Sequence, residues 1–190
     1  MKIKIGFFSV LLFLSLFLTH SYFAVCSFIA VILHELGHLI AARLCNVKFN
    51  TLSIGIYGAG LKADKTSFSY KNEILIALCG PLANLISAFL AIPIYIGAQS
   101  TSALYFIASS IILGMMNLMP IKTFDGGRIL HSVLCLRFSP FASDKTLSVI
   151  SFFVIFVLWT VSVYLMLIYG MGLSTFVFSL SLFSRFFIDI

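Results

Sequence analysis

Apolar stretches long enough to cross a bilayer recur along the whole chain of 190 residues. Only 9% of the residues are charged and 61% are hydrophobic, whereas soluble domains carry about 25% charged residues. We therefore predict an all-α polytopic membrane protein in which residues 1–190 form a single integral membrane domain. The N-terminal run resembles a signal peptide and is interpreted as a retained first span. Six spans are predicted, at about residues 4–19, 22–44, 74–97, 101–119, 146–168 and 171–188.

The formal net charge of +6 follows this topology. All 12 lysines and arginines lie in the N-terminal tail, in residues 43–71, in residues 122–145 or at Arg185. With six spans, these places share one side of the membrane, and short loops rich in basic residues stay in the cytoplasm. We therefore expect both termini and the opening of an active site on the cytoplasmic side, and no nucleic-acid partner.

Two connections between the predicted spans are longer than the others. Residues 46–73 alternate in polarity and contain closely spaced glycines, which predicts a short Gly-rich β-hairpin or re-entrant loop after the second span. In the second connection, residues 120–145, we expect Asp125 to start a short helix that ends before Pro140.

The stretch HELGH, residues 34–38 of the predicted second span, puts three ionisable side chains where lipid would surround them. A charged group near the bilayer centre costs about 2.5–3.5 kcal/mol on insertion scales, so such a cluster needs a stabilising partner. His34 and His38 lie one helical turn apart on the same face, so their rings can chelate one metal ion. Glu35 can then act as a base toward a water molecule that the ion activates.

The same cluster has other interpretations. The histidines and Glu35 could bond only to one another or to neighbouring helices. They could instead form the proton relay of a proton- or metal-ion-coupled membrane transporter. A membrane scaffold without activity is a third alternative. An enzyme predicts that Glu35→Gln keeps the metal but abolishes cleavage, whereas a transporter predicts altered flux.

Catalytic zinc usually takes three protein ligands, so a further His, Asp or Glu is needed at the same depth. Asp125 fits best, because it follows the fourth span and two glycines after it let the backbone approach the site. Its alternative role is the N-cap of the following helix. A zinc ion, Asp125, Glu35 and two neutral histidines carry no net charge, which favours this set in a membrane. Other candidates lie near span ends or in the Gly-rich connection: His20, Asp64, Glu73, Asp144 and Asp189.

These residues resemble the motifs of the site-2 protease family (peptidase family M50) of intramembrane zinc metalloproteases. HELGH (34–38) is similar to the first motif of the family, and NLMPIKTFDGG (117–127) is similar to the second. CGPLAN (79–84) resembles a Gly-Pro-x-x-Asn motif on the span between them. The resemblance covers about residues 34–130.

The resemblance implies that His34, His38 and Asp125 bind one Zn²⁺ per chain and that Glu35 is the catalytic acid and base. It also implies that four further residues position the site or the substrate: Asn84, Asn117, Pro120 and Gly126. Simpler roles are interhelical hydrogen bonds for the asparagines and a helix stop for the proline.

The six-span plan resembles the branch that contains the stage IV sporulation protein FB, which cleaves the pro-sequence of a sigma factor. This resemblance implies hydrolysis of a peptide bond in a membrane-associated or membrane-spanning substrate. The lipid bilayer and inhibitory membrane proteins are the further partners it implies. A helical substrate must unwind before cleavage, and the Gly-rich stretch 53–62 could offer it a strand edge. We expect a catalytic core at about residues 22–130, with accessory helices at residues 1–21 and 146–190.

Overall fold

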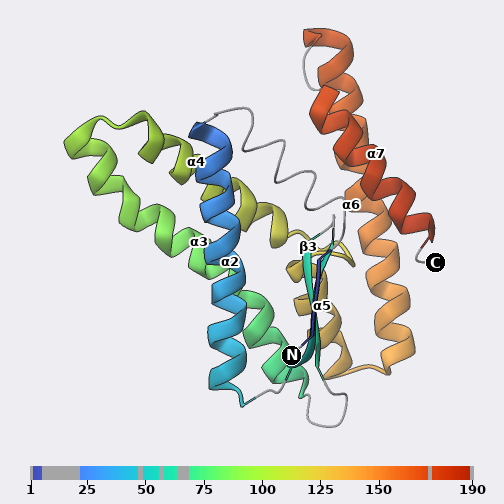
Figure 1. The fold of residues 1–190 in the computed structure, drawn as a ribbon. Helices are drawn as coiled ribbons and strands as arrows, with labels where there is room; N and C mark the ends of the chain where they lie inside the picture. The colour runs from blue at the N-terminus through green and yellow to red at the C-terminus, as the bar shows by residue number, and fades with distance from the viewer. Residues whose placement is uncertain are drawn as a thin grey trace. The chain divides into compact units, whose positions relative to one another are not determined.

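The computed structural model describes residues 2–5, 22–46, 49–55, 58–63, 69–170 and 173–188. The chain divides into two compact units, Met1–Leu118 and Met119–Ile190, and its helices are shown in Figure 1. That both units belong to one domain stays a prediction. Residues 4 and 5 of the predicted first span belong to a strand, and the rest of that span lies outside the described residues.

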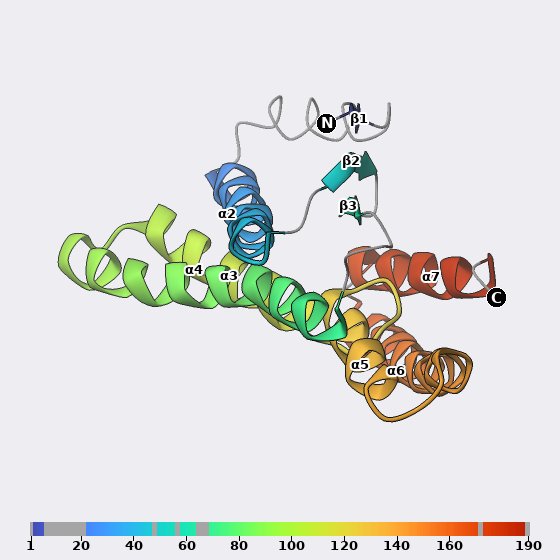
Figure 2. The ribbon, with the colours of Figure 1, turned by 90° about the horizontal axis from the view of Figure 1, so that it is seen from below.

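Three helices make up most of the first unit. They are α2 (Tyr22–Leu44), α3 (Tyr70–Ala98) and α4 (Thr101–Asn117), and Figure 2 shows α2 and α4 lying against α3. The turn from α3 to α4 follows from local chemistry. Gln99 ends α3 in the left-handed conformation with φ 50°, and the Ser100 hydroxyl caps α4 by accepting a hydrogen bond from the Ala103 N–H.

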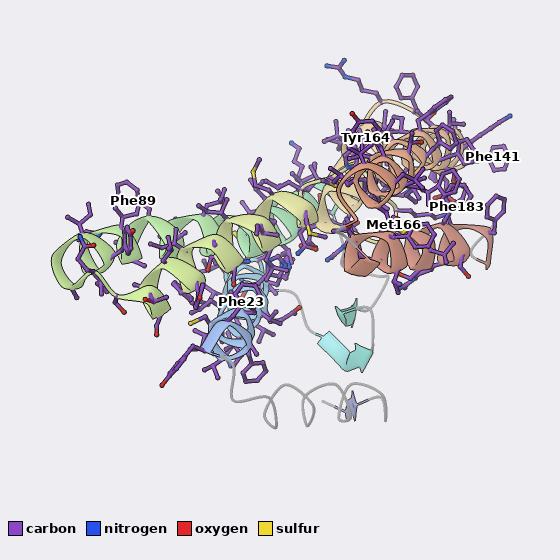
Figure 3. The ribbon with its side chains drawn as sticks, turned by 90° about the horizontal axis from the view of Figure 1, so that it is seen from above. Phe23, Phe89, Phe141, Tyr164, Met166 and Phe183 are labelled. Atoms are coloured by element: carbon purple, nitrogen blue, oxygen red, sulfur yellow. The ribbon has the colours of Figure 1, made fainter. Side chains whose placement is uncertain are left out.

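The helices of the first unit keep small residues inside and large apolar residues outside. On α2, Ala41 and Ala42 are at most 1% exposed, whereas Leu36 and Ile40 are 43% and 59% exposed. Phe89 of α3 is 70% exposed and points away from its helix in Figure 3. Soluble proteins usually bury their large apolar side chains. The reverse arrangement suits helices that face lipid, where small residues allow close helix packing.

A small sheet combines one strand from the N-terminal tail with two strands from the connection between α2 and α3. Strands β1 (Lys2–Ile5) and β2 (Phe49–Gly55) pair in parallel, and β3 (Gly58–Ala63) pairs antiparallel with β2. The register places Leu52 opposite Leu61. Residues 56 and 57, which would form the turn of the expected hairpin, lie outside the described part of the chain. The hairpin itself therefore stays a prediction.

The second unit contains α5 (Asp125–Cys135), α6 (Pro140–Tyr169) and α7 (Leu173–Ile188). Helix α6 packs against both of the others. Its start is fixed by the Ser139 hydroxyl, which accepts a hydrogen bond from the Ala142 N–H, and by Pro140 in the first turn. The short helix expected between Asp125 and Pro140 is confirmed by α5.

Three of the described helices, α2, α3 and α6, are long and apolar enough to cross a membrane. The apolar helices α4 and α7 are shorter. Helices therefore lie at the second to sixth predicted spans, and the bounds of α2 match the prediction. The chain has the character of a membrane protein, while the six-span topology stays a prediction.

Candidate metal centre

Helix α2 brings His34 and His38 together on its buried face. Each side chain is only 5% exposed, and the two Nε2 atoms lie 3.1 Å apart. The rings meet edge to face, with centroids 4.7 Å apart. The prediction that the two histidines share one helix face is therefore confirmed.

His38 is fixed by the backbone of α3. Its Nδ1 lies 2.8 Å from the carbonyl oxygen of Ile76. A carbonyl can only accept a hydrogen bond, so Nδ1 carries the proton and Nε2 keeps its lone pair. Metal-binding histidines usually donate their second ring N–H in this way, which fixes the tautomer and the orientation of the ring. His38 thus fits the role of a metal ligand through Nε2.

His34 is held by the side chain of Asn84 on α3. Asn84 is fully buried, and its Nδ2 lies 3.2 Å from Nδ1 of His34. The other amide atom of Asn84, Oδ1, is buried and has no hydrogen-bond partner. The expectation that Asn84 serves the site is consistent with this contact, which the sequence could not reveal.

Two glycines let α3 approach the histidine pair. A Cβ added at Gly80 would overlap Nε2 and Cε1 of His38. A Cβ added at Gly37 would lie 2.5 Å from the carbonyl oxygen of Cys79 and 2.8 Å from Cβ of Ala83. Contacts this short force a neighbour to shift, which is the helix backbone of α3 at Gly37 and the ring of His38 at Gly80. The sequence shows Gly80 within the motif CGPLAN but not what it contacts, and it does not reveal the carbonyl of Ile76 as a partner of His38.

Glu35 follows His34 on α2 and is half-buried. Successive helix residues point about 100° apart around the axis, so Glu35 leaves the helix beside the histidine face and not on it. A carboxylate in that place can serve the site without being a ligand of the same ion. Its catalytic role stays a prediction.

In the second unit, Asp125 is the first residue of α5 and is 7% exposed. Its Oδ1 lies 3.4 Å from Nη1 of Arg128, one turn further along the helix. The N-cap position belongs to Phe124, so the alternative role of Asp125 as N-cap is wrong. A carboxylate in the first turn still interacts favourably with the helix dipole.

The remaining predicted site residues lie close to Asp125 in the sequence or at the end of α4. Gly126 is buried in the first turn of α5. Asn117 ends α4 and donates from Nδ2 to the carbonyl of Leu113, 3.0 Å away. The Pro120 carbonyl accepts a hydrogen bond from the Ser151 hydroxyl at 3.3 Å. The Asn117 contact lies within α4 and is not the interhelical hydrogen bond of its simpler role, whereas Pro120, which follows the end of α4, fits a helix stop. The roles of these residues at the site stay predictions.

The weaker ligand candidates either have local roles in the structure or lie outside the described residues. Glu73 lies in the first turn of α3. Asp144 is 53% exposed and lies 3.5 Å from Nζ of Lys122. His20, Asp64 and Asp189 lie outside the described residues.

The donor set of the first unit fits a zinc ion. Two imidazoles face each other through Nε2, and both side chains are buried. Imidazole nitrogen is a common ligand of catalytic zinc. Of the two outer ring nitrogens, that of His38 is already bonded in the way such ligands require.

Comparison with known proteins supports this interpretation. A zinc metalloprotease of Methanocaldococcus jannaschii is 30% identical over 123 residues, which cover 62% of this chain and 36% of that protein. Rip3 of Mycobacterium tuberculosis, named as a putative zinc metalloprotease, is 27% identical over 122 residues, which cover 60% of this chain and 31% of that protein. The chain therefore spans about a third of the length of these relatives.

The fold is also similar to a solved structure. The site-2 protease from Methanocaldococcus jannaschii matches with a TM-score of 0.61 and 23% identity, over 85% of this chain and 74% of that chain. The sequence profile of Peptidase family M50 matches residues 22–101 and 96–161, which include both histidines and Asp125. On this evidence the chain belongs to peptidase family M50.

Proposed function

We propose that this protein is an intramembrane zinc metalloendopeptidase of the site-2 protease type. The observation that carries the proposal is the buried pair of His34 and His38, whose Nε2 atoms lie 3.1 Å apart. Two buried imidazoles on one face of an apolar helix need a reason, because polar groups at membrane depth are costly. A shared cation that accepts both lone pairs gives one.

We propose Asp125 as the third ligand. All three side chains are buried, and zinc accepts a carboxylate oxygen beside two imidazole nitrogens. One carboxylate ligand and Glu35 would balance the two charges of zinc, so the loaded site would be neutral. Loss of bound zinc in Asp125→Ala tests this ligand.

The chemistry follows from these roles. A zinc ion bound there would polarise the carbonyl of the scissile peptide bond and acidify a water molecule. Glu35 would take a proton from the attacking water as its oxygen bonds to the carbonyl carbon, and would pass it to the amine as the C–N bond breaks, a contribution of about 10²–10⁴-fold in rate for a well-placed general base. The histidines stay neutral throughout. The lipid-facing apolar helices supply the setting in which a membrane-embedded peptide can reach the site.

The finer features of the proposal concern topology and substrate. We propose six spans with both termini in the cytoplasm, since the basic residues cluster in the tail and the two long connections. We propose that the Gly-rich hairpin presents a strand edge to an unwound substrate. The substrate class is a membrane-associated protein such as a pro-sigma factor, as in the branch of the stage IV sporulation protein FB, and inhibitory membrane proteins are further partners.

The test is cleavage in membranes. The chain is co-expressed with a tagged pro-sigma factor that carries an apolar pro-sequence, and processing is followed by immunoblotting. Wild type should shorten the substrate, and Glu35→Gln should leave it intact while the membrane content of the protease is unchanged. Asp144→Asn is the matched control, because this exposed carboxylate pairs with Lys122 and should be dispensable.

A panel of single-span membrane proteins, tested in the same way, separates the reaction from the choice of substrate. Cleavage of a panel member in place of the pro-sigma factor would support the proposed peptidase activity and contradict the proposed substrate. Absence of all cleavage, together with zinc or proton flux in proteoliposomes that depends on Glu35, would overturn the peptidase in favour of a transporter.

A further inference from the structure

The side-chain amide of Asn84 points its amino group, and not its oxygen, at His34. Its Nδ2 lies 3.2 Å from Nδ1 of His34, while its Oδ1 is buried without a partner. The two ends of an amide have nearly the same shape, so the hydrogen bonds around them decide the orientation. A fully buried acceptor without a donor costs about 1–3 kcal/mol. Another interaction must therefore compensate for this cost, or the orientation belongs to the metal-free state alone.

The protons of the metal-free site form a consistent chain. His38 donates from Nδ1 to the Ile76 carbonyl, so its Nε2 must accept. Nε2 of His34 lies 3.1 Å away and can donate to it, and this nitrogen then carries the proton of that ring. Nδ1 of His34 is left with a lone pair, and the Asn84 amide donates to it. Each contact in this chain has one donor and one acceptor.

A cation at the two Nε2 atoms breaks this chain at His34. Nε2 must now supply a lone pair, so the proton of the neutral ring moves to Nδ1, with no change in the charge of the imidazole. Nδ1–H would then face the Asn84 amino group, and two donors would oppose each other. His38 needs no change, because its tautomer is the same in both states. The conflict is therefore confined to Asn84.

We propose that Asn84 is a positioning residue whose amide turns by half a rotation when the ion binds, so that Oδ1 accepts from Nδ1–H of His34. This inference rests on the proposed function, since it assumes an ion at Nε2. The turn gives a partner to the buried oxygen that lacks one, and it fixes His34 in the tautomer that binds metal. Outer hydrogen-bond partners of this kind typically change metal affinity by about 10–100-fold.

Zinc affinity of the purified full chain in detergent micelles tests the proposal by competition with a chelator of known affinity. Asn84→Leu keeps the volume but has no acceptor, and it should weaken zinc binding by about 10–100-fold. Asn84→Asp presents an oxygen in either orientation, and it should bind zinc no more weakly than wild type. Ser110→Ala is the control, because it removes another fully buried polar group without a partner from the same three-helix unit. Its affinity should equal that of wild type.

A second readout needs no variant at Asn84. In protein labelled with ¹⁵N-histidine, the zinc-loaded form should show a protonated Nδ1 at His34, assigned by its loss in His34→Ala. The metal-free form should show a protonated Nε2 at the same residue. A role in packing alone predicts the opposite order of variants, because the apolar side chain of Asn84→Leu would then be tolerated and the buried carboxylate of Asn84→Asp would not.

The possible failures are distinct. If wild type binds no zinc, the proposed function fails. If wild type binds zinc and Asn84→Leu binds it equally well, or if Asn84→Asp binds it as weakly as Asn84→Leu, only the role of Asn84 is overturned. A loaded His34 without a proton on Nδ1 would overturn it as well.

Discussion

The interface between α2 and α3 and the interface between α6 and α7 are packed in opposite ways. At Gly37 the backbone of α2 lies so close to Cys79 of α3 that an added Cβ would be 2.5 Å from the carbonyl oxygen. Between α6 and α7, aromatic rings fill the space. Phe152 of α6 lies 6.1 Å and 5.9 Å, between ring centroids, from Phe183 and Phe186 of α7.

This difference reflects what each interface has to hold. Two backbones in contact leave little freedom to slide or rotate, so the rings of His34 and His38 meet the Ile76 carbonyl and the Asn84 amide at fixed distances. Aromatic pairs contribute stability over a range of centroid separations, about 4.5–7 Å, and in more than one arrangement, so they fix the geometry of an interface less closely. The first interface is therefore expected to control metal binding, and the second only the stability of its own unit.

The largest effect is expected for Gly80→Ala. The added methyl group would occupy the place of the His38 ring, so the ring would have to leave its position. Zinc affinity should fall by more than the roughly 100-fold that loss of an outer hydrogen-bond partner can cause, and cleavage should disappear. Chelator competition and the cleavage assay measure both. Gly97→Ala, in the same helix with nothing near the added Cβ, should keep wild-type affinity, and equal loss in both variants would refute the packing argument.

A smaller effect is expected for Gly37→Ala. The new Cβ meets backbone and not a flexible side chain, so α2 and α3 must separate. Overpacking of this kind costs about 1–3 kcal/mol, partly offset by the higher helix propensity of alanine, which is worth up to about 1 kcal/mol. The free energy of unfolding in detergent and denaturant measures the net loss, with Gly97→Ala giving the propensity gain alone. An unfolding free energy equal to that of Gly97→Ala would show that the helices are not in such close contact.

The smallest effect is expected for Phe183→Leu. Its ring contacts Phe152 and Trp159, and aromatic pairs contribute about 0.5–1.5 kcal/mol beyond their buried area. The unfolding free energy should fall by about this amount, while zinc affinity stays at the wild-type value. Phe178→Leu, at a position of α7 that is 40% exposed, should lower the unfolding free energy by less and should also leave zinc affinity at the wild-type value. Loss of zinc binding in Phe183→Leu would contradict the division of roles between the two interfaces.

The comparison also explains what the sequence could predict. The shared face of His34 and His38 is predictable because helical spacing alone places them there. Helix α5 is predictable because Asp125 favours a helix start and Pro140 requires the helix to end before it. The partners of the histidines were not predictable in the same way. Any residue has a carbonyl, so nothing in the sequence distinguishes that of Ile76, and only packing selects it.

Other differences have equally local reasons. Gly80 carried a signal, since glycine next to proline inside an apolar helix is unusual, but the signal does not say which side chain needs the space. Asp125 was given the N-cap as its alternative role, but helix ends are uncertain by a residue or two, and Phe124 holds that position. The predicted span 101–119 runs two residues past the end of α4 at Asn117, because hydropathy marks an apolar run and not where a helix ends.

The central claim is that the buried histidine pair, completed by Asp125, binds one catalytic zinc ion. Its most direct test is the zinc content of the detergent-purified protein, measured by elemental mass spectrometry. The account predicts about one zinc per chain in wild type and in Glu35→Gln, and clearly less in His34→Ala and Asp125→Ala. Full zinc content in Asp125→Ala would contradict the proposed ligand set, and absence of zinc from folded wild type that was purified without chelators would contradict the metal centre itself.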